Sequence, residues 1–219
     1  VTMTRLKDHF LIRNYEDAKS FDETMIVGRN YRFTILSEVL IRLEYSPDGR
    51  FENRPTEFAS FRKFNPPKFF IKNEKEYLTI STNYFKLEYQ KEKPFYGTKL
   101  APDINLRVGL NNTDKIWFFG APEARNFKGT SYSLDNLEGS VSFEKGLYST
   151  DGFASIDDSK SLIINEDGSL IKRDDQRIDT YLFLYRKDFG FCLRDYFKLT
   201  GKPPLIPRYA LGNWWNKNV

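Results

Sequence analysis

Apolar and polar residues alternate along most of this chain, and this period of two constrains the fold more than any other feature. Between residues 9 and 186 the alternation recurs in short runs, as in Tyr31, Phe33 and Ile35 with polar residues between them. Successive side chains of a β-strand point to opposite faces of the sheet, so this spacing predicts strands. The 20 Phe and 13 Tyr residues also favour strands over helices. We therefore predict an all-β fold.

The strand-like runs are short and are separated by turn residues rather than by helices. They lie at Tyr31–Ile35, Leu40–Ser46, Phe69–Lys72, Tyr77–Ser81, Tyr84–Tyr89, Ile104–Val108, Lys115–Phe119, Phe153–Ile156, Ser161–Ile164, Ser169–Ile171 and Asp179–Tyr185. The runs between residues 69 and 89 indicate a meander with short turns. About a dozen short strands without intervening helices predict a large antiparallel β-sandwich. The irregular stretch Gly120–Thr150 has two open interpretations: it covers an edge or builds a site, or it is a plain surface excursion.

One segment near the end has a helical period instead. In Asp188–Thr200, apolar residues recur at spacings of three and four, with Asp188 placed as an N-cap. Gly201 can adopt a positive φ there, and Pro203 prevents the helix from continuing. We therefore divide the chain into a β-sandwich, residues 1–186, and a helix, Pro-rich linker and further strand, residues 187–219.

That further strand is predicted at Tyr209–Trp215. The run is too apolar for a surface loop and is typical of a buried strand of a parallel sheet, for which the sequence supplies no partner strand. We expect the segment Ile206–Val219 to be disordered or packed on a neighbouring molecule. If it is uncovered, Tyr209, Leu211, Trp214 and Trp215 would form an apolar patch that favours self-association into a homo-oligomer.

Composition excludes several classes of function. The net charge of +4 comes from 34 basic and 30 acidic residues without a basic block, which argues against nucleic acid as a partner. The single cysteine excludes an internal disulfide. No run has the length of a signal peptide or a membrane span, so we expect a cytoplasmic protein that does not insert into membranes.

Most familiar catalytic and cofactor sites are excluded as well. One histidine, His9, and one cysteine, Cys192, cannot form the paired ligands of a zinc site. Neither a nucleophile elbow nor a phosphate-binding glycine loop occurs, so we expect no metal and no cofactor. The adjacent Asp157 and Asp158 would point to opposite faces of a strand and could not converge on one glycosidic bond.

Asp151 is the remaining acidic candidate. It lies in Ser149–Phe153, beside Gly152, which permits a sharp turn. Two interpretations stay open from the residues alone: the carboxylate accepts hydrogen bonds from sugar hydroxyls, or it only stabilises the turn.

Three blocks of the sequence resemble one enzyme family. They are Tyr196–Trp215, which reads YFKLTGKPPLIPRYALGNWW; the pair Asn126–Thr130 and Leu134–Asp135 followed by Gly146–Ser159; and Tyr31–Ile35 through Leu40–Ser46 to Arg54–Thr56. In their order along the chain, the blocks are similar to glycoside hydrolase family 31, which contains α-glucosidases and α-xylosidases. Together they span about four fifths of the chain.

The resemblance implies a galactose mutarotase-like supersandwich that precedes a (β/α)8 catalytic barrel. It implies a retaining α-glycosidase acting on α-linked glucosides or xylosides, with both catalytic aspartates on the barrel beyond Val219. The chain alone is then expected to be inactive, to pack on its own barrel and to lend the Asp151 loop to the substrate pocket. Asn218 falls where many members carry a Tyr that lines the substrate pocket, and this difference leaves the sugar open. Trp215 has two open interpretations: it stacks on a sugar face, or it packs within the first barrel strand.

Two other functions compete with this interpretation. The chain could be an independent carbohydrate-binding module that holds an α-linked oligosaccharide through surface aromatics, or a purely structural interaction domain. The first predicts sugar affinity without a barrel, and the second predicts none.

Overall fold

The computed structural model describes residues 12, 14–96, 105–129, 139, 142–173, 176–203 and 205–210. Strands dominate this part of the chain and form two five-stranded antiparallel sheets and a two-stranded one, β10 (Ile163–Ile164) with β11 (Leu170–Ile171). The described helices are η1 (Tyr15–Ala18), η2 (Asp22–Thr24), α2 (Phe189–Thr200) and η3 (Arg208–Ala210). The prediction of an all-β sandwich with one C-terminal helix is confirmed.

The first sheet, which we call the middle sheet, contains strands from both ends of the domain. Its order is β1 (Met25–Val27), β2 (Tyr31–Ser37), β3 (Leu40–Tyr45), β12 (Ile178–Leu184) and β9 (Phe153–Asp157). The late strand β12 pairs with β3 on one side and with β9 on the other, both antiparallel. The fold therefore depends on contacts between residues far apart in the sequence.

The second sheet, which we call the outer sheet, is a simple meander. It consists of β4 (Phe70–Asn73), β5 (Tyr77–Ser81), β6 (Phe85–Gln90), β7 (Leu106–Leu110) and β8 (Ile116–Phe118), each paired with the next. The meander predicted from residues 69 to 89 is confirmed, and β7 and β8 extend it.

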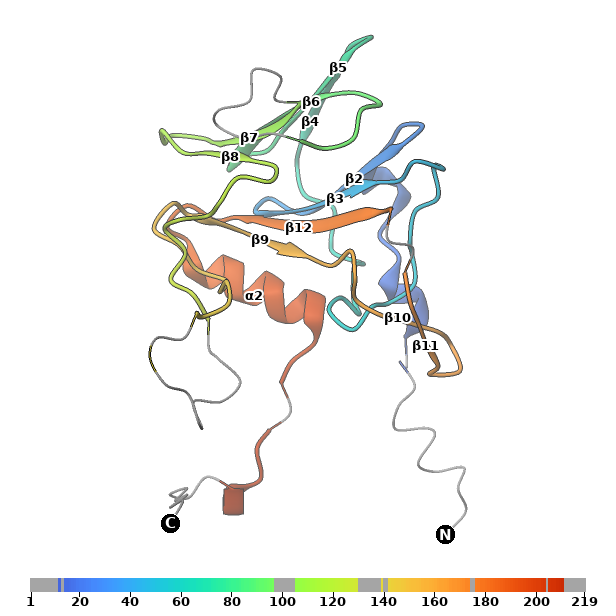
Figure 1. Cartoon of the computed structure of the whole chain (residues 1–219), viewed down its shortest axis with the longest axis vertical. Helices are drawn as coiled ribbons and strands as arrows, with labels where there is room; N and C mark the ends of the chain where they lie inside the picture. Colours follow the sequence, from blue (N-terminus) through green and yellow to red (C-terminus); the bar gives the residue numbers. More distant parts are fainter. Residues whose placement is uncertain are drawn as a thin grey trace.

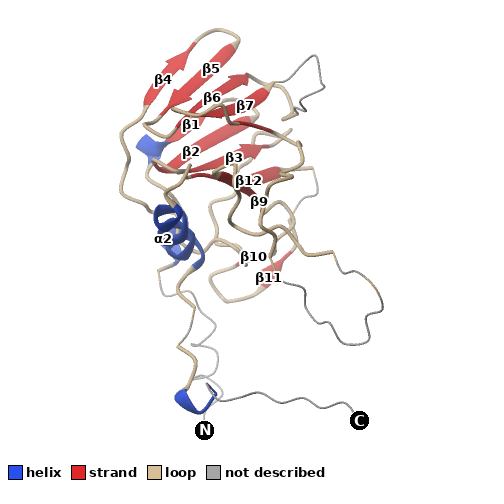
Figure 2. Ribbon diagram, turned by 90° about the vertical axis from the view of Figure 1, so that its left-hand side faces the viewer, coloured by secondary structure: helices blue, strands red, loops and turns tan. Residues whose placement is uncertain are grey.

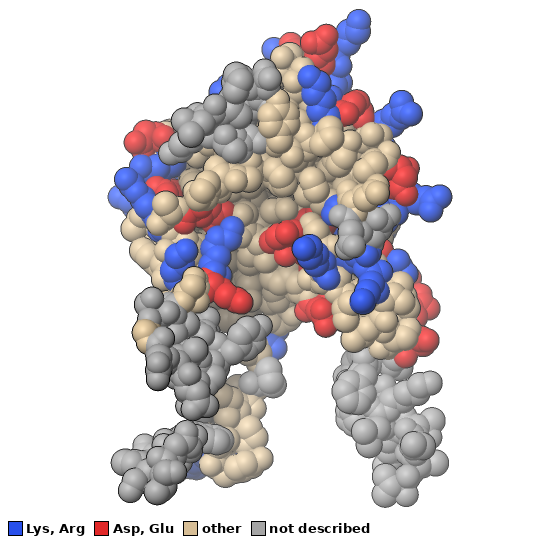
Figure 3. All heavy atoms as spheres, in the orientation of Figure 1, with Lys and Arg blue, Asp and Glu red and all other residues tan. Residues whose placement is uncertain are grey.

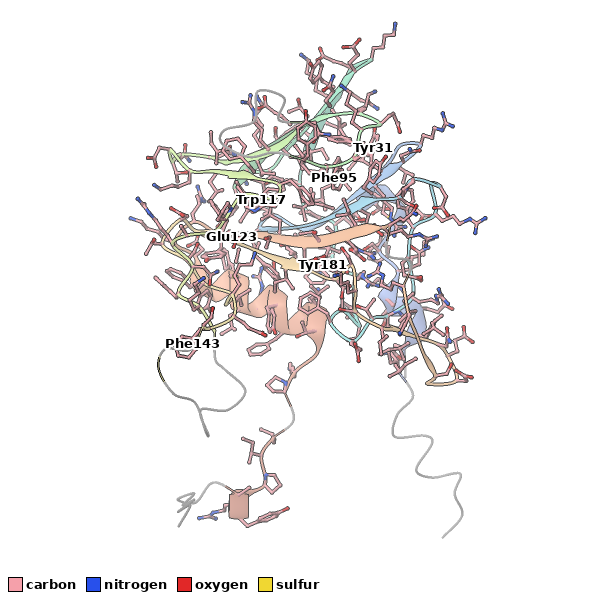
Figure 4. All side chains as sticks on the ribbon, viewed as in Figure 1. Tyr31, Phe95, Trp117, Glu123, Phe143 and Tyr181 are labelled. Atoms are coloured by element: carbon pink, nitrogen blue, oxygen red, sulfur yellow. The ribbon has the colours of Figure 1, made fainter. Side chains whose placement is uncertain are left out.

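The two sheets pack face to face over the main hydrophobic core, and α2 covers the other face of the middle sheet (Figures 1 and 2). Figure 4 shows Tyr31 and Phe95 between the sheets and Tyr181 on the helix side. Because both faces of the middle sheet are covered, the residues of β2 and β3 are almost all buried. In β2 and β3, alternate side chains therefore point into two different buried regions, one between the sheets and one under α2, and neither face is open to solvent.

The helix begins and ends close to the predicted residues, but its cap differs from the expectation. Asp188 occupies the N-cap position without a side-chain cap hydrogen bond. Its carboxylate instead accepts a 2.9 Å hydrogen bond from the Tyr84 hydroxyl, which ties the helix start to the loop before β6. Gly201 follows the helix with φ 93°, as its lack of a side chain permits.

The helix side of the middle sheet contains a network of buried charges. Arg42 donates to both oxygens of Asp179, at 2.8 and 2.6 Å, and it also lies 3.1 Å from Glu44. Arg32 pairs with Glu44 at 2.6 Å, and Arg173 donates to Asp179 at 2.6 Å. Each charge is nearly inaccessible to solvent, so it must be paired and hydrogen-bonded to remain ionised.

Electrostatics keep Asp179 ionised. Burial alone would raise its pKa, but the Arg42 and Arg173 guanidinium groups outweigh burial and hold the pKa well below its usual range. Burial raises the pKa of the neighbouring Asp158, and the Asp179 carboxylate adds to this rise. Of the two neighbouring carboxyl groups, Asp179 therefore carries a negative charge more readily than Asp158.

One observed strand was not predicted, and one predicted strand needs correction. Sequence analysis did not predict β1, whose three residues are too few to show a period. The predicted strand Tyr209–Trp215 begins differently: Tyr209 and Ala210 lie in the turn η3, and Tyr209 is exposed. No described strand lies beside this turn to pair with it, and the rest of the predicted strand, with Trp214 and Trp215, lies outside the described residues.

We predict that Asp179→Asn destabilises the fold by about 3–5 kcal/mol, because the change leaves the Arg42 and Arg173 charges buried without their partner. Urea unfolding followed by tryptophan fluorescence measures this difference. As a control, Arg107→Ala removes a surface ion pair with Glu88 and should stay within about 1 kcal/mol of wild type. A similar small loss for both variants would contradict a structural role for the buried network.

Candidate functional site

Asp151 lies in a tight turn that leads into β9. Ser149 precedes it in an isolated bridge to Asn126, and Gly152 follows it with φ 77°. The Ser149 side chain forms the turn: its hydroxyl donates to the Phe153 carbonyl at 2.6 Å, and the Gly152 N–H reaches the Ser149 carbonyl at 3.4 Å. Among the described residues, none donates a hydrogen bond to the Asp151 carboxylate. The turn is thus held by groups other than the Asp151 side chain.

Main-chain contacts fix this turn against the junction of β12 and α2. The Gly152 carbonyl accepts hydrogen bonds from the backbone N–H groups of Tyr185 and Arg186, at 2.9 and 2.8 Å. The Ser149 N–H donates to the Tyr185 hydroxyl at 2.7 Å. Burial raises the pKa of Tyr185 to about 12, so this hydroxyl stays protonated at neutral pH.

Two cations flank the carboxylate. One oxygen of Asp151 lies 3.5 Å from the Arg125 guanidinium and 3.8 Å from the Lys115 amine, and the Asp151 side chain is 18% exposed. These distances exceed those of close charge-assisted hydrogen bonds, which are about 2.7–2.9 Å. The pairs therefore hold the carboxylate loosely and leave it able to accept hydrogen bonds from a ligand.

A hollow of about 540 Å³ opens beside this group of charges. It is lined by β8 with its flanking residues and by the segment that begins at Ala121; Asp151 and Phe153 complete it. Acidic and basic side chains are mixed across the face shown in Figure 3. Carboxylate and cationic groups together can bind the hydroxyl and ring oxygens of a neutral polar ligand such as a sugar.

Glu123 connects β8 to β9 by hydrogen bonds on the inner side of the hollow. Its Oε1 accepts hydrogen bonds from the Trp117 indole N–H at 3.3 Å, from the Lys145 amine at 3.0 Å and from the Ser155 backbone N–H at 3.0 Å. Figure 4 shows Glu123 close to Trp117, on the segment between the two sheets. Sequence analysis did not select Glu123; the only signal was a single acidic residue in the weakly polar run from Gly120 to Ala124.

The other candidates from the sequence are distributed as follows. Asp157 is exposed and Asp158 is fully buried, so the two do point to opposite sides. Cys192 is buried against the middle sheet, and burial raises the pKa of its thiol. His9, Trp215 and Asn218 lie outside the described residues. Within the described ranges, no group of three or more potential ligands forms a metal site, and no helix is long and apolar enough to cross a membrane.

We predict that Gly152→Ala displaces the Asp151 turn. A Cβ there would lie 2.5 Å from the Arg186 carbonyl oxygen, and the positive φ adds strain of about 1–3 kcal/mol. Gly109→Ala is the control, since a Cβ at Gly109 meets nothing within 4 Å. Thermal unfolding should show a clear loss for the first variant and a change within about 0.5 kcal/mol for the second. Equal stability of the two would show that the turn is not clamped.

Comparisons with known proteins give a structural likeness and nothing at the level of sequence. No protein-family model matches the chain, and no curated protein matches it. The solved structures similar to it include a GH31 dextranase from Flavobacterium johnsoniae complexed with glucose, at 16% identity and a TM-score of 0.44. A mutant of that dextranase complexed with isomaltotriose is similar at 17% identity and a TM-score of 0.42. Each likeness covers 84% of this chain but only 27% of the dextranase chain, so this chain spans about a quarter of that length.

Proposed function

We propose that this chain is the N-terminal β-sandwich of a retaining α-glycosidase of glycoside hydrolase family 31. Its role is to pack on a catalytic barrel and to lend Asp151 to the substrate pocket. The family comes from the sequence resemblance in Tyr196–Trp215 and the two earlier blocks. The substrates are α-linked glucosides or xylosides.

The observation that carries the proposal is the Asp151 carboxylate at the edge of the hollow, which accepts no hydrogen bond from the described residues and is paired with Lys115 and Arg125 only at 3.8 and 3.5 Å. A residue that only stabilises a turn uses its side chain within the turn, as Ser149 does here. Asp151 instead faces Lys115 and Arg125 at distances that leave its oxygens available. A carboxylate in this position accepts hydrogen bonds from sugar hydroxyls, each worth about 1.5–3 kcal/mol.

The chemical step requires groups other than Asp151. A retaining glycosidase needs two carboxyl groups about 5 Å apart, one as nucleophile and one as acid and base. Asp158 and Asp179 are close to one another but lie buried within the Arg42 network, where no sugar can reach them. In the proposal, the catalytic pair therefore belongs to the barrel, and Asp151 contributes binding energy in the transition state.

An independent carbohydrate-binding module is the second candidate. Such modules stack sugars on exposed aromatic rings. Of the aromatic residues that line the hollow, Trp117 and Phe153 are buried and Phe118 is half-buried, so none offers a fully exposed ring. Exposed rings do occur at Phe70 and Tyr77 on β4 and β5, and this observation keeps the candidate in consideration. Titration of the 219-residue chain with maltose, isomaltose and xylosides tests it directly.

We predict that Asp151→Ala, in the longer protein that carries the barrel, lowers kcat/KM by about ten- to a hundredfold, because a transition-state hydrogen bond is lost. The melting temperature should hardly change, since the turn does not use this side chain. Asp22→Ala is the control: it removes an acid that is 84% exposed and lies outside the hollow, and it should leave kcat/KM unchanged. The reverse result, lower stability with unchanged kcat/KM, would mean that Asp151 only stabilises the turn.

A further inference from the structure

The strand β4 forms one edge of the outer sheet and has β5 as its only described neighbour (Figure 2). All four residues of β4 are exposed, and two of them are large and apolar: Phe70 is 79% exposed and Ile71 is 47% exposed. An edge strand presents unpaired backbone N–H and C=O groups, which can pair with a strand of another chain. The open edge of β4 is therefore a candidate interaction surface.

The edge of the middle sheet at β9 shows how this chain closes an edge where it does so. The backbone N–H of Ser155 donates to Glu123 at 3.0 Å. The Ser149 hydroxyl accepts from the Phe153 N–H at 3.4 Å and donates to the Phe153 carbonyl at 2.6 Å. In the part of the chain that the structure describes, no group is bonded in this way to the outward backbone of β4.

The pairing of β4 with β5 determines which backbone groups are open. The Glu74 N–H donates to the Tyr77 carbonyl at 2.9 Å and closes the hairpin. Bonded and non-bonded residue pairs alternate along an antiparallel ladder. Counting back from Glu74 in the observed register, Asn73 and Ile71 occupy the non-bonded positions. These two residues therefore turn their N–H and C=O groups away from β5, toward the open edge.

We propose that β4 pairs antiparallel with β4 of a second copy of this chain, about a twofold axis at Ile71, and so joins two outer sheets into one. In this register Ile71 faces Ile71 of the second copy, and Asn73 faces its Phe69, so that open backbone groups meet open backbone groups. A twofold interface of this kind uses the same surface on both chains and closes as a dimer. The inference goes beyond the proposed function and does not depend on it.

Charged side chains select this register over its neighbours. Residues 68, 70, 72 and 74 share one face of the strand. In the proposed register, the exposed Lys68 lies opposite Glu74 of the second copy, and Phe70 lies opposite its Lys72; each contact occurs twice. A shift by two residues in one direction places Lys72 opposite Lys72, and a shift in the other direction places Lys68 opposite Lys72. Like charges directly opposite one another destabilise a strand pair.

The test exchanges these charges in the 219-residue chain. The variants are Lys68→Glu and Glu74→Lys, and the control is Lys160→Glu, at an exposed position after β9. Thermal unfolding first checks that all three fold. Because β4 is short, the interface is small and the dimer is weak. Sedimentation equilibrium is therefore measured at high protein concentration and at low ionic strength, where exposed charges are screened least.

We predict that the dissociation constant of the dimer rises about tenfold or more in each single variant, because two pairs of like charges then face one another. An equimolar mixture of the two variants should dimerise about as tightly as the wild type, since every charge again meets its opposite. Lys160→Glu should match the wild type. A chain that stays monomeric at every soluble concentration would overturn the proposal, and so would a mixture that dimerises no better than the single variants.

A cross-link tests the register itself. Directly opposite residues of a bonded pair have Cα atoms about 5.5 Å apart, a distance that a disulfide can span. Ile71→Cys should therefore form a disulfide-linked dimer under oxidation, and the one native cysteine, Cys192, is buried. Asn73→Cys is the control: in this register the two copies of residue 73 are offset by four residues, about 13 Å. Equal cross-linking of the two variants would overturn the proposed pairing.

Discussion

The buried ion pair between Arg42 and Asp179 is the interaction on which the middle sheet depends. The two residues are 137 positions apart, and their contact aligns β12 with β3. A slip of one residue would turn every side chain of β12 to the other face and carry Asp179 into the hydrocarbon core between the sheets. The attraction between the buried charges roughly offsets the cost of removing them from water, so they add little net stability. They do, however, make the wrong register unfavourable. The free-energy cost of placing Asp179 in the apolar core therefore makes the pairing of β12 with β3 specific.

The same strand also determines where the candidate site lies. β12 ends at Leu184, and the next two backbone N–H groups, of Tyr185 and Arg186, hold the carbonyl of Gly152. The Asp151 turn is thus positioned by main-chain hydrogen bonds and by the side chains of Ser149 and Tyr185, and not by the side chain of Asp151. The Asp151 carboxylate thus gains a defined position while its oxygens make only two long ion pairs, which leaves them able to accept hydrogen bonds from a ligand.

The sequence predicted the strands and the helix well, because each depends on a local period. Local pattern cannot show that both faces of β2 and β3 are covered, so the burial of Arg32 and Arg42 was not foreseen. Glu123 escaped prediction because its role depends on Trp117 and Ser155, which come from two different sheets. Asp151 was predicted as a candidate, and its neighbours Lys115 and Arg125 were not.

The helix that follows β12 has a practical consequence for anyone who shortens this chain. Cys192 and Leu199 fill a second hydrophobic cluster with Tyr181 and Phe183 of β12. A protein ending at Arg186 would leave that cluster open to water and would expose an apolar sheet face suited to aggregation. A shortened chain should therefore keep α2 to its end at Thr200, and Gly201 is the natural place to stop or to attach another protein.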